Sequence, residues 1–206
     1  MITLWGRLNS INVQKVFWAL EELGVPYERR EAGLHHGVVN TPEYRRMNPN
    51  GLVPVLEDDG FVLWESNAIV RYLAARHDPG GLWPQDLRVR ADADRWMDWQ
   101  TTAFGPAMGP AFHGLIRTPP EKRDQNAIAQ ALAKAETFAA ILDTHLAERP
   151  YVAGERFTMG DIAAGAAAHR WLNLPAERTP RPHLEAWHRR LRERPAGAKA
   201  LTVPLT

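Results

Sequence analysis

The stretch NPNGLVPVLEDDGFVLWESNAIVRYL, residues 48–73, decides the fold. It holds two short apolar runs, Val53–Leu56 and Phe61–Trp64, separated by an Asp-Asp-Gly turn, and this pattern predicts an antiparallel hairpin. Ser66 follows the second run after a single residue, Glu65, and is predicted to cap a helix with a regularly spaced apolar face. Pro54 stands at a strand start, where its missing N–H does least harm and where a cis bond can persist. The segment therefore predicts a ββα unit.

Upstream of this unit the pattern changes period twice. Residues 2–5 are strand-like, residues 13–23 carry apolar side chains at helical spacing, and residues 27–31 are a second predicted strand. A right-handed crossover makes the two strands parallel. Residues 33–50 are irregular, with a short helix predicted at Thr41-Pro42-Glu43. The first part of the chain is thus predicted to run βαβ and then ββα.

The downstream part is predicted to be helical almost throughout. Residues 77–86 have the composition of a linker. Predicted helices then span residues 87–117, with a kink or break at two Gly-Pro pairs, and residues 119–146, 158–172, 182–193 and 196–201. Thr158 and Asp161 have the spacing of a capping box. The pattern predicts an α/β N-terminal domain over residues 1–80 and an all-α helical-bundle C-terminal domain over residues 86–206.

Composition excludes several classes of protein. The chain of 206 residues contains no cysteine, so it has no disulfide framework, no thiolate nucleophile and no cysteine-ligated metal site. Any thiol chemistry must come from a substrate. The eight histidines form no HExxH motif, and no carboxylate cluster has ligand spacing, so no metal site is expected.

The charge balance bears on partners and location. Because 25 basic residues face 24 acidic ones without any basic block, no nucleic-acid partner is expected. No secretory signal and no run of about 20 apolar residues is found, so we expect no membrane segment and a cytoplasmic location.

Two segments are candidates for chemistry because each leads from a strand into a helix start. The first contains Ser10 and Asn12, and the second contains Glu65 and Ser66. A helix N-terminus offers free N–H groups and positive dipole to an anion, although each of these side chains could also serve as an ordinary cap. No GxSxG motif is present, which disfavours a hydrolase triad.

Three ordered motifs together resemble the soluble glutathione transferase family. They are Asn48–Leu56 with its Val-Pro pair, Leu63–Ile69 followed by Tyr72-Leu73, and Phe157–Ala163. They are similar, in order, to the family's cis-proline loop, its glutathione-anchoring helix start and its folding cap in the helical domain. The resemblance covers essentially the whole chain and suggests a bacterial-like serine- or asparagine-type branch.

The resemblance implies a thioredoxin-like N-terminal domain that binds glutathione as co-substrate. It implies that Ser66 and Glu65 hold the γ-glutamyl group, and that Val53, before a cis Pro54, pairs its backbone with the cysteinyl part. Ser10 and Asn12 match the two positions from which relatives activate the thiol, and we rank Ser10 first.

The implied second substrate is a small hydrophobic electrophile, bound in part by the helical domain, and the implied assembly is a homodimer. A minority of the aromatic and methionine side chains in residues 96–112 is expected to line the electrophile pocket. Leu52 stands where several branches place a polar group toward the glycine end of glutathione. His36, with His35 and Arg45 as further candidates, could replace that anchor.

Three other functions remain open from the sequence. The same thiolate could serve a glutathione-dependent isomerase or dehalogenase. A disulfide reductase is disfavoured because the chain lacks cysteine, although glutathione could supply both thiols. A non-catalytic interaction protein of the same fold is disfavoured by the intact Ser10, Val53-Pro54 and Glu65-Ser66 set.

Overall fold

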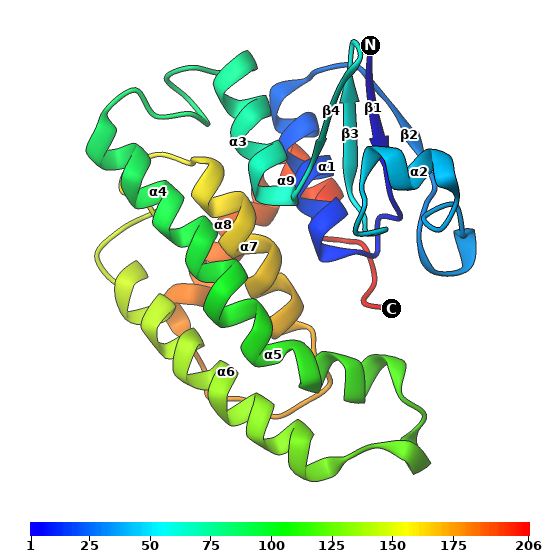
Figure 1. The fold of residues 1–206 in the computed structure, drawn as a ribbon. Helices are drawn as coiled ribbons and strands as arrows, with labels where there is room; N and C mark the ends of the chain where they lie inside the picture. The colour runs from blue at the N-terminus through cyan, green and yellow to red at the C-terminus, as the bar shows by residue number, and fades with distance from the viewer.

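The computed structural model describes residues 1–206 and shows an N-terminal α/β unit beside a helical bundle (Figure 1). The N-terminal unit contains β1 (Ile2–Trp5), α1 (Ile11–Leu23), β2 (Tyr27–Arg30), a 3-10 turn (Leu34–His36), α2 (Pro42–Met47), β3 (Val55–Asp58), β4 (Phe61–Trp64) and α3 (Ser66–His77). The bundle contains α4 (Leu87–Trp99), α5 (Gly105–Phe112), α6 (Gln125–Leu146), α7 (Met159–Leu172), α8 (Pro182–Glu193) and α9 (Pro195–Ala200). The predicted fold class is confirmed.

The four strands form one mixed sheet in the order β2-β1-β3-β4. β1 and β2 are parallel, as the crossover through α1 requires, and β3 is antiparallel to both β1 and β4. The hairpin turns through Asp59 and Gly60, which both have positive φ, 48° and 89°, as a two-residue hairpin loop prefers. α1 and α3 pack together beside the sheet, and Figure 1 shows α2 on its other side.

The cis-proline prediction is confirmed, but the strand after it begins later than expected. The Val53-Pro54 bond is cis, and β3 starts at Val55. A cis bond turns the chain sharply, so Val53 does not enter the β1–β3 ladder.

Three predictions about helix ends were wrong in detail. The N-cap of α3 is Glu65 rather than Ser66, because Glu65 turns the chain out of β4 with φ 73° and Ser66 is already helical. Asn12 is not a cap either, since the N-cap of α1 is Ser10. The helix predicted from residue 119 begins at Gln125, where the carboxylate of Asp124 accepts a hydrogen bond from the Ala127 N–H at 2.9 Å.

Of the kink or break predicted at the Gly-Pro pairs, the break does not occur. Residues 87–117 stay helical, and two π-helical segments, Gln100–Phe104 and His113–Arg117, alternate with α4 and α5. The first π segment ends directly before Gly105 and Pro106, so Pro106 falls in the first turn of α5, where its missing N–H does least harm, while Pro110 lies inside α5. This long helical stretch carries one wall of the pocket described below.

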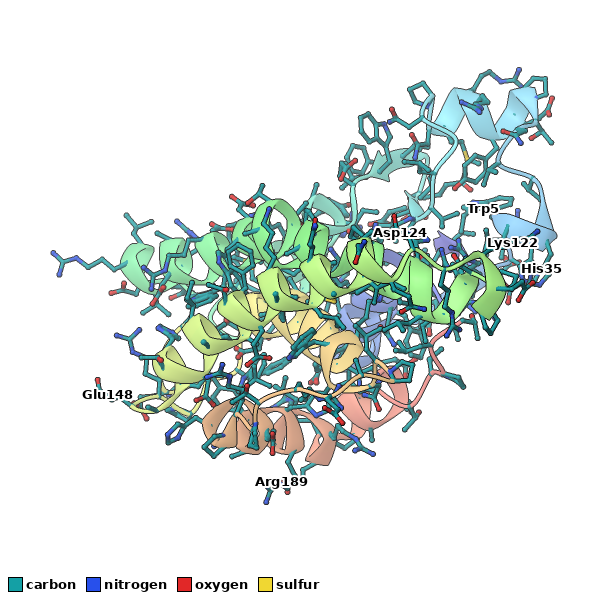
Figure 2. All side chains as sticks on the ribbon, turned by 90° about the horizontal axis from the view of Figure 1, so that it is seen from below. Trp5, His35, Lys122, Asp124, Glu148 and Arg189 are labelled. Atoms are coloured by element: carbon teal, nitrogen blue, oxygen red, sulfur yellow. The ribbon has the colours of Figure 1, made fainter.

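The helical domain is built around the buried α7. Every residue from Met159 to His169 is buried, and Gly160 brings α7 against α4, since a Cβ there would stand 3.0 Å from the Ala93 backbone. α1 packs against α7 and α9, so a single hydrophobic core joins the two domains. Figure 2 shows α6 running along the outside from Asp124 toward Glu148, with Arg189 of α8 pointing into solvent. None of the helices combines the length and the apolar character that a membrane crossing requires.

Candidate active site

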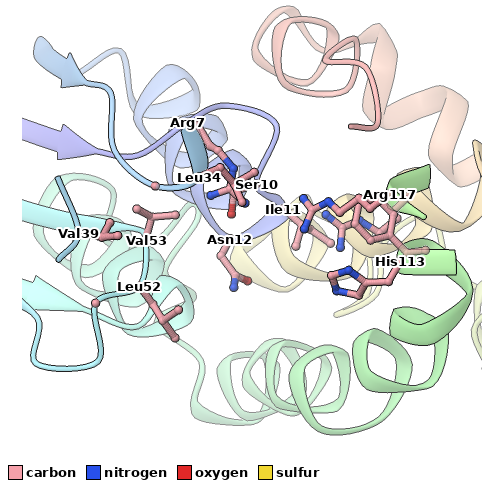
Figure 3. Close-up of a pocket in the computed structure, with 14 residues that line it drawn as sticks. Arg7, Ser10, Ile11, Asn12, Leu34, Val39, Leu52, Val53, His113 and Arg117 are labelled. Atoms are coloured by element: carbon pink, nitrogen blue, oxygen red, sulfur yellow. The ribbon is translucent and has the colours of Figure 1, made fainter. Parts of the chain in front are cut away.

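A pocket of about 410 Å³ lies between the two domains (Figure 3). We call it the interdomain pocket. The N-terminal unit lines it with the β1–α1 loop, the start of α1, the loop after β2 and the cis-proline loop. The helical domain lines it with Phe112, His113, Arg117 and Arg170. The loop that follows β1 thus faces side chains from two distant segments of the bundle.

Ser10 is the N-cap residue of α1, but its hydroxyl does not cap the helix. Its backbone is extended, with φ −88° and ψ 123°, and its side chain accepts no hydrogen bond from the helix N–H groups. The side chain is 8% exposed and lines the interdomain pocket. A nearly buried hydroxyl with a free proton therefore lies at the positive end of a helix dipole.

Asn12 lies two residues after Ser10 and connects the starts of α1 and α3. It is exposed and lines the pocket, and its Oδ1 accepts a hydrogen bond from the Ser66 hydroxyl at 3.4 Å. Because the amide oxygen is engaged by Ser66, the NH2 group of Asn12 remains available as a second donor near Ser10 (Figure 3).

The cis-proline loop presents a length of unpaired backbone to the pocket. The N–H and C=O of Val53 make no backbone hydrogen bond, and Val53 lines the cavity. Two hydrogen bonds fix the loop on the side away from the pocket, because the Tyr44 hydroxyl and the Asn48 side-chain amide both donate to the Leu52 carbonyl at 2.9 Å. A bound peptide-like ligand can pair with Val53 as an additional strand would.

The start of α3 forms a second polar corner next to Asn12. Glu65 is exposed, and its positive φ aims the chain so that Ser66, 6% exposed, begins the helix. The first helical hydrogen bond runs from the Ile69 N–H to the Glu65 carbonyl, which leaves the earlier N–H groups of α3 without acceptors. Such a corner suits a ligand that carries a carboxylate next to an ammonium group.

A buried polar cluster below the site fixes the two helix starts relative to each other. The Lys15 ammonium donates to Asn67 Oδ1 at 2.8 Å and to Gln100 Oε1 at 3.0 Å, and the Asn67 amide donates to the Met97 carbonyl at 2.8 Å. Burial lowers the pKa of Lys15 to about 7. The cluster links α1, α3 and the long helical stretch of the second domain.

Four predicted site residues do not line the interdomain pocket. Pro54 forms the cis bond of the loop without lining the cavity. Ser66 is connected to the pocket by its hydrogen bond to the lining residue Asn12, and Glu65 precedes Ser66 in the chain. His36 lies in the loop after β2, its ring tilted by 40° against that of His35, with its Nε2 3.4 Å from a Glu31 carboxylate oxygen. Of the aromatic and methionine side chains predicted for the second site, Phe112 lines the interdomain pocket, Met108 lines an adjoining hollow that shares Ile11, Asn12 and Arg170 with it, and Phe104 belongs to the core.

The sequence analysis did not identify Arg7, His113, Arg117 and Arg170 as pocket residues. Arg7 lies in the same loop as Ser10, and Arg170 follows the run of small and apolar residues in α7. A charged arginine directly after this apolar run is unusual, and it was the one sequence signal that could have identified Arg170 as a pocket residue. Burial, together with Arg117 and Arg170, lowers the pKa of His113, so this imidazole is neutral at physiological pH.

Comparisons with known proteins agree with this geometry. The family model described as glutathione S-transferase, N-terminal domain, matches residues 1–75, and the corresponding C-terminal domain model matches residues 125–190. Glutathione S-transferase GstB of Escherichia coli (strain K12) is 45% identical over 208 residues, covering 100% of both chains.

A solved structure shows the same likeness. The theta class glutathione S-transferase from the citrus canker pathogen Xanthomonas axonopodis pv. citri, with glutathione bound, is 49% identical with a TM-score of 0.96, covering 100% of this chain and 99% of that one. More distantly, the disulfide-bond oxidoreductase YfcG of Escherichia coli (strain K12) is 29% identical over 92% of this chain and 90% of its own. With both family models matched and full-length relatives at this identity, the chain belongs to the glutathione S-transferase family.

Proposed function

We propose that this enzyme activates the thiol of glutathione and transfers the tripeptide to small electrophiles. The observation that carries the proposal is the free Ser10 hydroxyl at the N-terminus of α1, facing the unpaired backbone of Val53 across the pocket. A thiol has a pKa of about 8.5, so at neutral pH only a small fraction is thiolate. A hydroxyl donor and a helix dipole both favour the anion, and they raise that fraction.

The polar groups around the pocket match the parts of glutathione in order. We assign the γ-glutamyl carboxylate to the Ser66 corner and its ammonium group to Glu65. The cysteinyl unit pairs with Val53 before cis Pro54, which places its sulfur toward Ser10 and Asn12. For the glycine carboxylate we propose His36, whose ring would turn from Glu31 toward the adjacent pocket residues Gly33 and Leu34.

The chemistry then needs only the substrate's own sulfur. The thiolate attacks an electrophilic carbon, a carbon–sulfur bond forms, and the leaving group departs with its electron pair. Because the chain contains no cysteine, the protein forms no covalent sulfur intermediate. The residues hold and orient the tripeptide and stabilise the anion.

A panel of electrophiles assayed with and without glutathione tests the proposal. We expect enzyme-dependent loss of electrophile only when glutathione is present, with the conjugate detected by mass spectrometry. A mixed-disulfide substrate, included because of the likeness to YfcG, tests the reductase alternative. Isomerised or dehalogenated products without a lasting conjugate would favour the other enzymes of this fold. Binding of glutathione with no turnover of any compound would favour an interaction protein.

Ser66→Ala is expected to weaken glutathione binding. In the proposed complex the Ser66 hydroxyl turns from Asn12 Oδ1 and donates to the γ-glutamyl carboxylate, and a hydrogen bond to a charged group contributes about 1.5–3 kcal/mol, or about 10- to 150-fold in Kd. Isothermal titration calorimetry measures the change, and Thr158→Ala, remote from the pocket, is the matched loss of a hydroxyl. An unchanged Kd for Ser66→Ala would move the anchor elsewhere.

We also propose that the enzyme is a cytoplasmic homodimer that removes reactive electrophiles. The cytoplasm maintains the reduced glutathione that the reaction consumes.

The proposed homodimer has apolar surface available for an interface. Edge strand β4 exposes Phe61 (48%) and Trp64 (37%), and a hollow beside α4 and α6 is lined by Trp96, Trp99 and the exposed Ile141. Such apolar surfaces favour association. Light scattering should give twice the 23.2 kDa of the chain, and a single-chain mass at micromolar concentration would contradict the dimer.

A further inference from the structure

Three arginines that line the interdomain pocket have no Asp or Glu side chain as a partner. Arg7 comes from the β1–α1 loop, Arg117 from the end of the helical stretch 87–117, and Arg170 from α7. None of them pairs with an Asp or Glu side chain, whereas Arg71, Arg181 and Arg194 elsewhere in the molecule each do. The buried Nε atoms of Arg7 and Arg170 have no hydrogen-bond partner at all. Unsatisfied cationic groups at a pocket wall need a reason.

The arginines are held in place although they repel one another. The Arg170 guanidinium lies 3.9 Å from the centroid of the Phe112 ring, and the Arg117 guanidinium lies 4.8 Å from it. Arg117 also donates to the Thr206 main-chain oxygen at 3.0 Å. Burial and the neighbouring Arg117 and Arg7 lower the pKa of Arg170 to about 10, which leaves it charged at neutral pH. Phe112 thus orients two cations without neutralising them.

Arg117 and Arg170, which both lie over Phe112, are on the side of Ser10 that faces away from the cis-proline loop, whereas Arg7 lies beside Gly33 in the loop after β2. Figure 3 shows Ser10 and Asn12 between Val53 and Leu52 on one side and His113 and Arg117 on the other. The groups assigned above to the carboxylates of glutathione lie at the α3 corner and in the loop after β2. An anion bound at Arg117 and Arg170 therefore belongs to the second substrate. His113, the other titratable group on this wall, is neutral and adds no charge.

We propose that the electrophile carries a carboxylate, which Arg117 and Arg170 bind with Arg7 adding positive potential, while Phe112 and Ile11 contact its apolar part. The inference rests on the proposed function and narrows its substrate class. Paired N–H donors of a guanidinium match the two oxygens of a carboxylate, and the low dielectric of the pocket strengthens the attraction. The carboxylate positions the electrophilic carbon and is not consumed.

A matched pair of substrates tests this charge preference. In 4-(chloromethyl)benzoate and 4-(chloromethyl)benzamide the reaction is the same: the carbon–sulfur bond forms at the benzylic carbon and chloride leaves with the bonding pair. We expect kcat/KM for the benzoate to exceed that for the benzamide by about 10-fold or more after subtraction of the uncatalysed rates. In Arg117→Gln and Arg170→Gln this ratio should fall toward one. Arg189→Gln, an exposed arginine on α8, should keep the wild-type ratio (Figure 2).

Inhibition of the wild-type enzyme gives a readout that does not depend on the folding of a variant. Unreactive 4-methylbenzoate should compete with the electrophile at about 10-fold lower concentration than 4-methylbenzamide. Equal kcat/KM values for the two substrates, with normal conjugation, would overturn the inference and leave the proposed function intact. A raised KM for glutathione in the arginine variants, at an unchanged ratio, would assign the arginines to glutathione and also overturn it. If neither substrate nor any other electrophile is conjugated, the proposed function fails and the inference fails with it.

Discussion

Asp161→Ala is expected to destabilise the protein by about 3–5 kcal/mol, more than any surface substitution. The carboxylate is fully buried and accepts four hydrogen bonds. Two come from the Thr158 N–H at 2.9 Å and the Thr158 hydroxyl at 3.4 Å, one from the Val152 N–H at 2.9 Å, and one from the Trp187 indole N–H at 2.9 Å. Removing the side chain leaves all of these donors buried without a partner. It also removes the hydrogen bond that connects the start of α7 to Trp187 of α8.

Urea unfolding at pH 7.5 measures the change. Burial raises the pKa of Asp161 to about 6 against the opposing effect of the four donors, so the group is ionised at this pH. Thr158→Ala removes only the hydroxyl of the capping box and should cost about 1 kcal/mol. A loss of about 1 kcal/mol for both variants would mean that Asp161 acts as an ordinary cap. Since a domain has about 5–15 kcal/mol in total, the Asp161 variant is best measured at low temperature.

Most of the fold could be predicted because local signals agreed with one another. The hairpin had apolar runs around a turn that tolerates positive φ, and the start of α7 had its capping box. The errors occurred where a local signal had two interpretations. Pro106 and Pro110 usually interrupt a helix, but here both lie in α5, which continues between two π-helical segments, and tertiary packing rather than sequence decides between the two outcomes.

The candidate site could be predicted only in its N-terminal half. Ser10, Asn12 and Val53 lie next to recognisable turns, and the structure brings them to one cavity. The arginine wall gathers residues 7, 117 and 170, which no spacing rule connects. Glu65 shows a different limit: its positive φ is unusual for a residue with a Cβ, so the sequence favoured Ser66 as the cap. Contacts between residues far apart in the sequence, and unusual backbone angles such as that of Glu65, therefore could not be predicted from a single sequence.

Ser10→Ala is expected to slow conjugation at neutral pH by about 10- to 100-fold while changing the affinity for glutathione much less. A hydrogen bond to the thiolate, worth about 1.5–3 kcal/mol, corresponds to about one to two pKa units of the bound thiol. Losing it should shift the rising limb of the pH–rate profile upward by that amount, so that turnover recovers at high pH. The profile of kcat at saturating glutathione measures the pKa in the complex directly.

Asn12→Ala is the matched comparison, because both side chains line the pocket at the start of α1. Ser10 is ranked first since its hydroxyl is nearly buried and makes no hydrogen bond to the helix, whereas Asn12 is exposed and already engages Ser66. A hydrogen bond is stronger in the less solvated position. A Ser10→Ala profile superimposable on that of the wild type, with the Asn12→Ala profile shifted upward, would assign the activation to Asn12. Two unshifted profiles would leave the backbone amides and dipole of α1 as the groups that stabilise the thiolate.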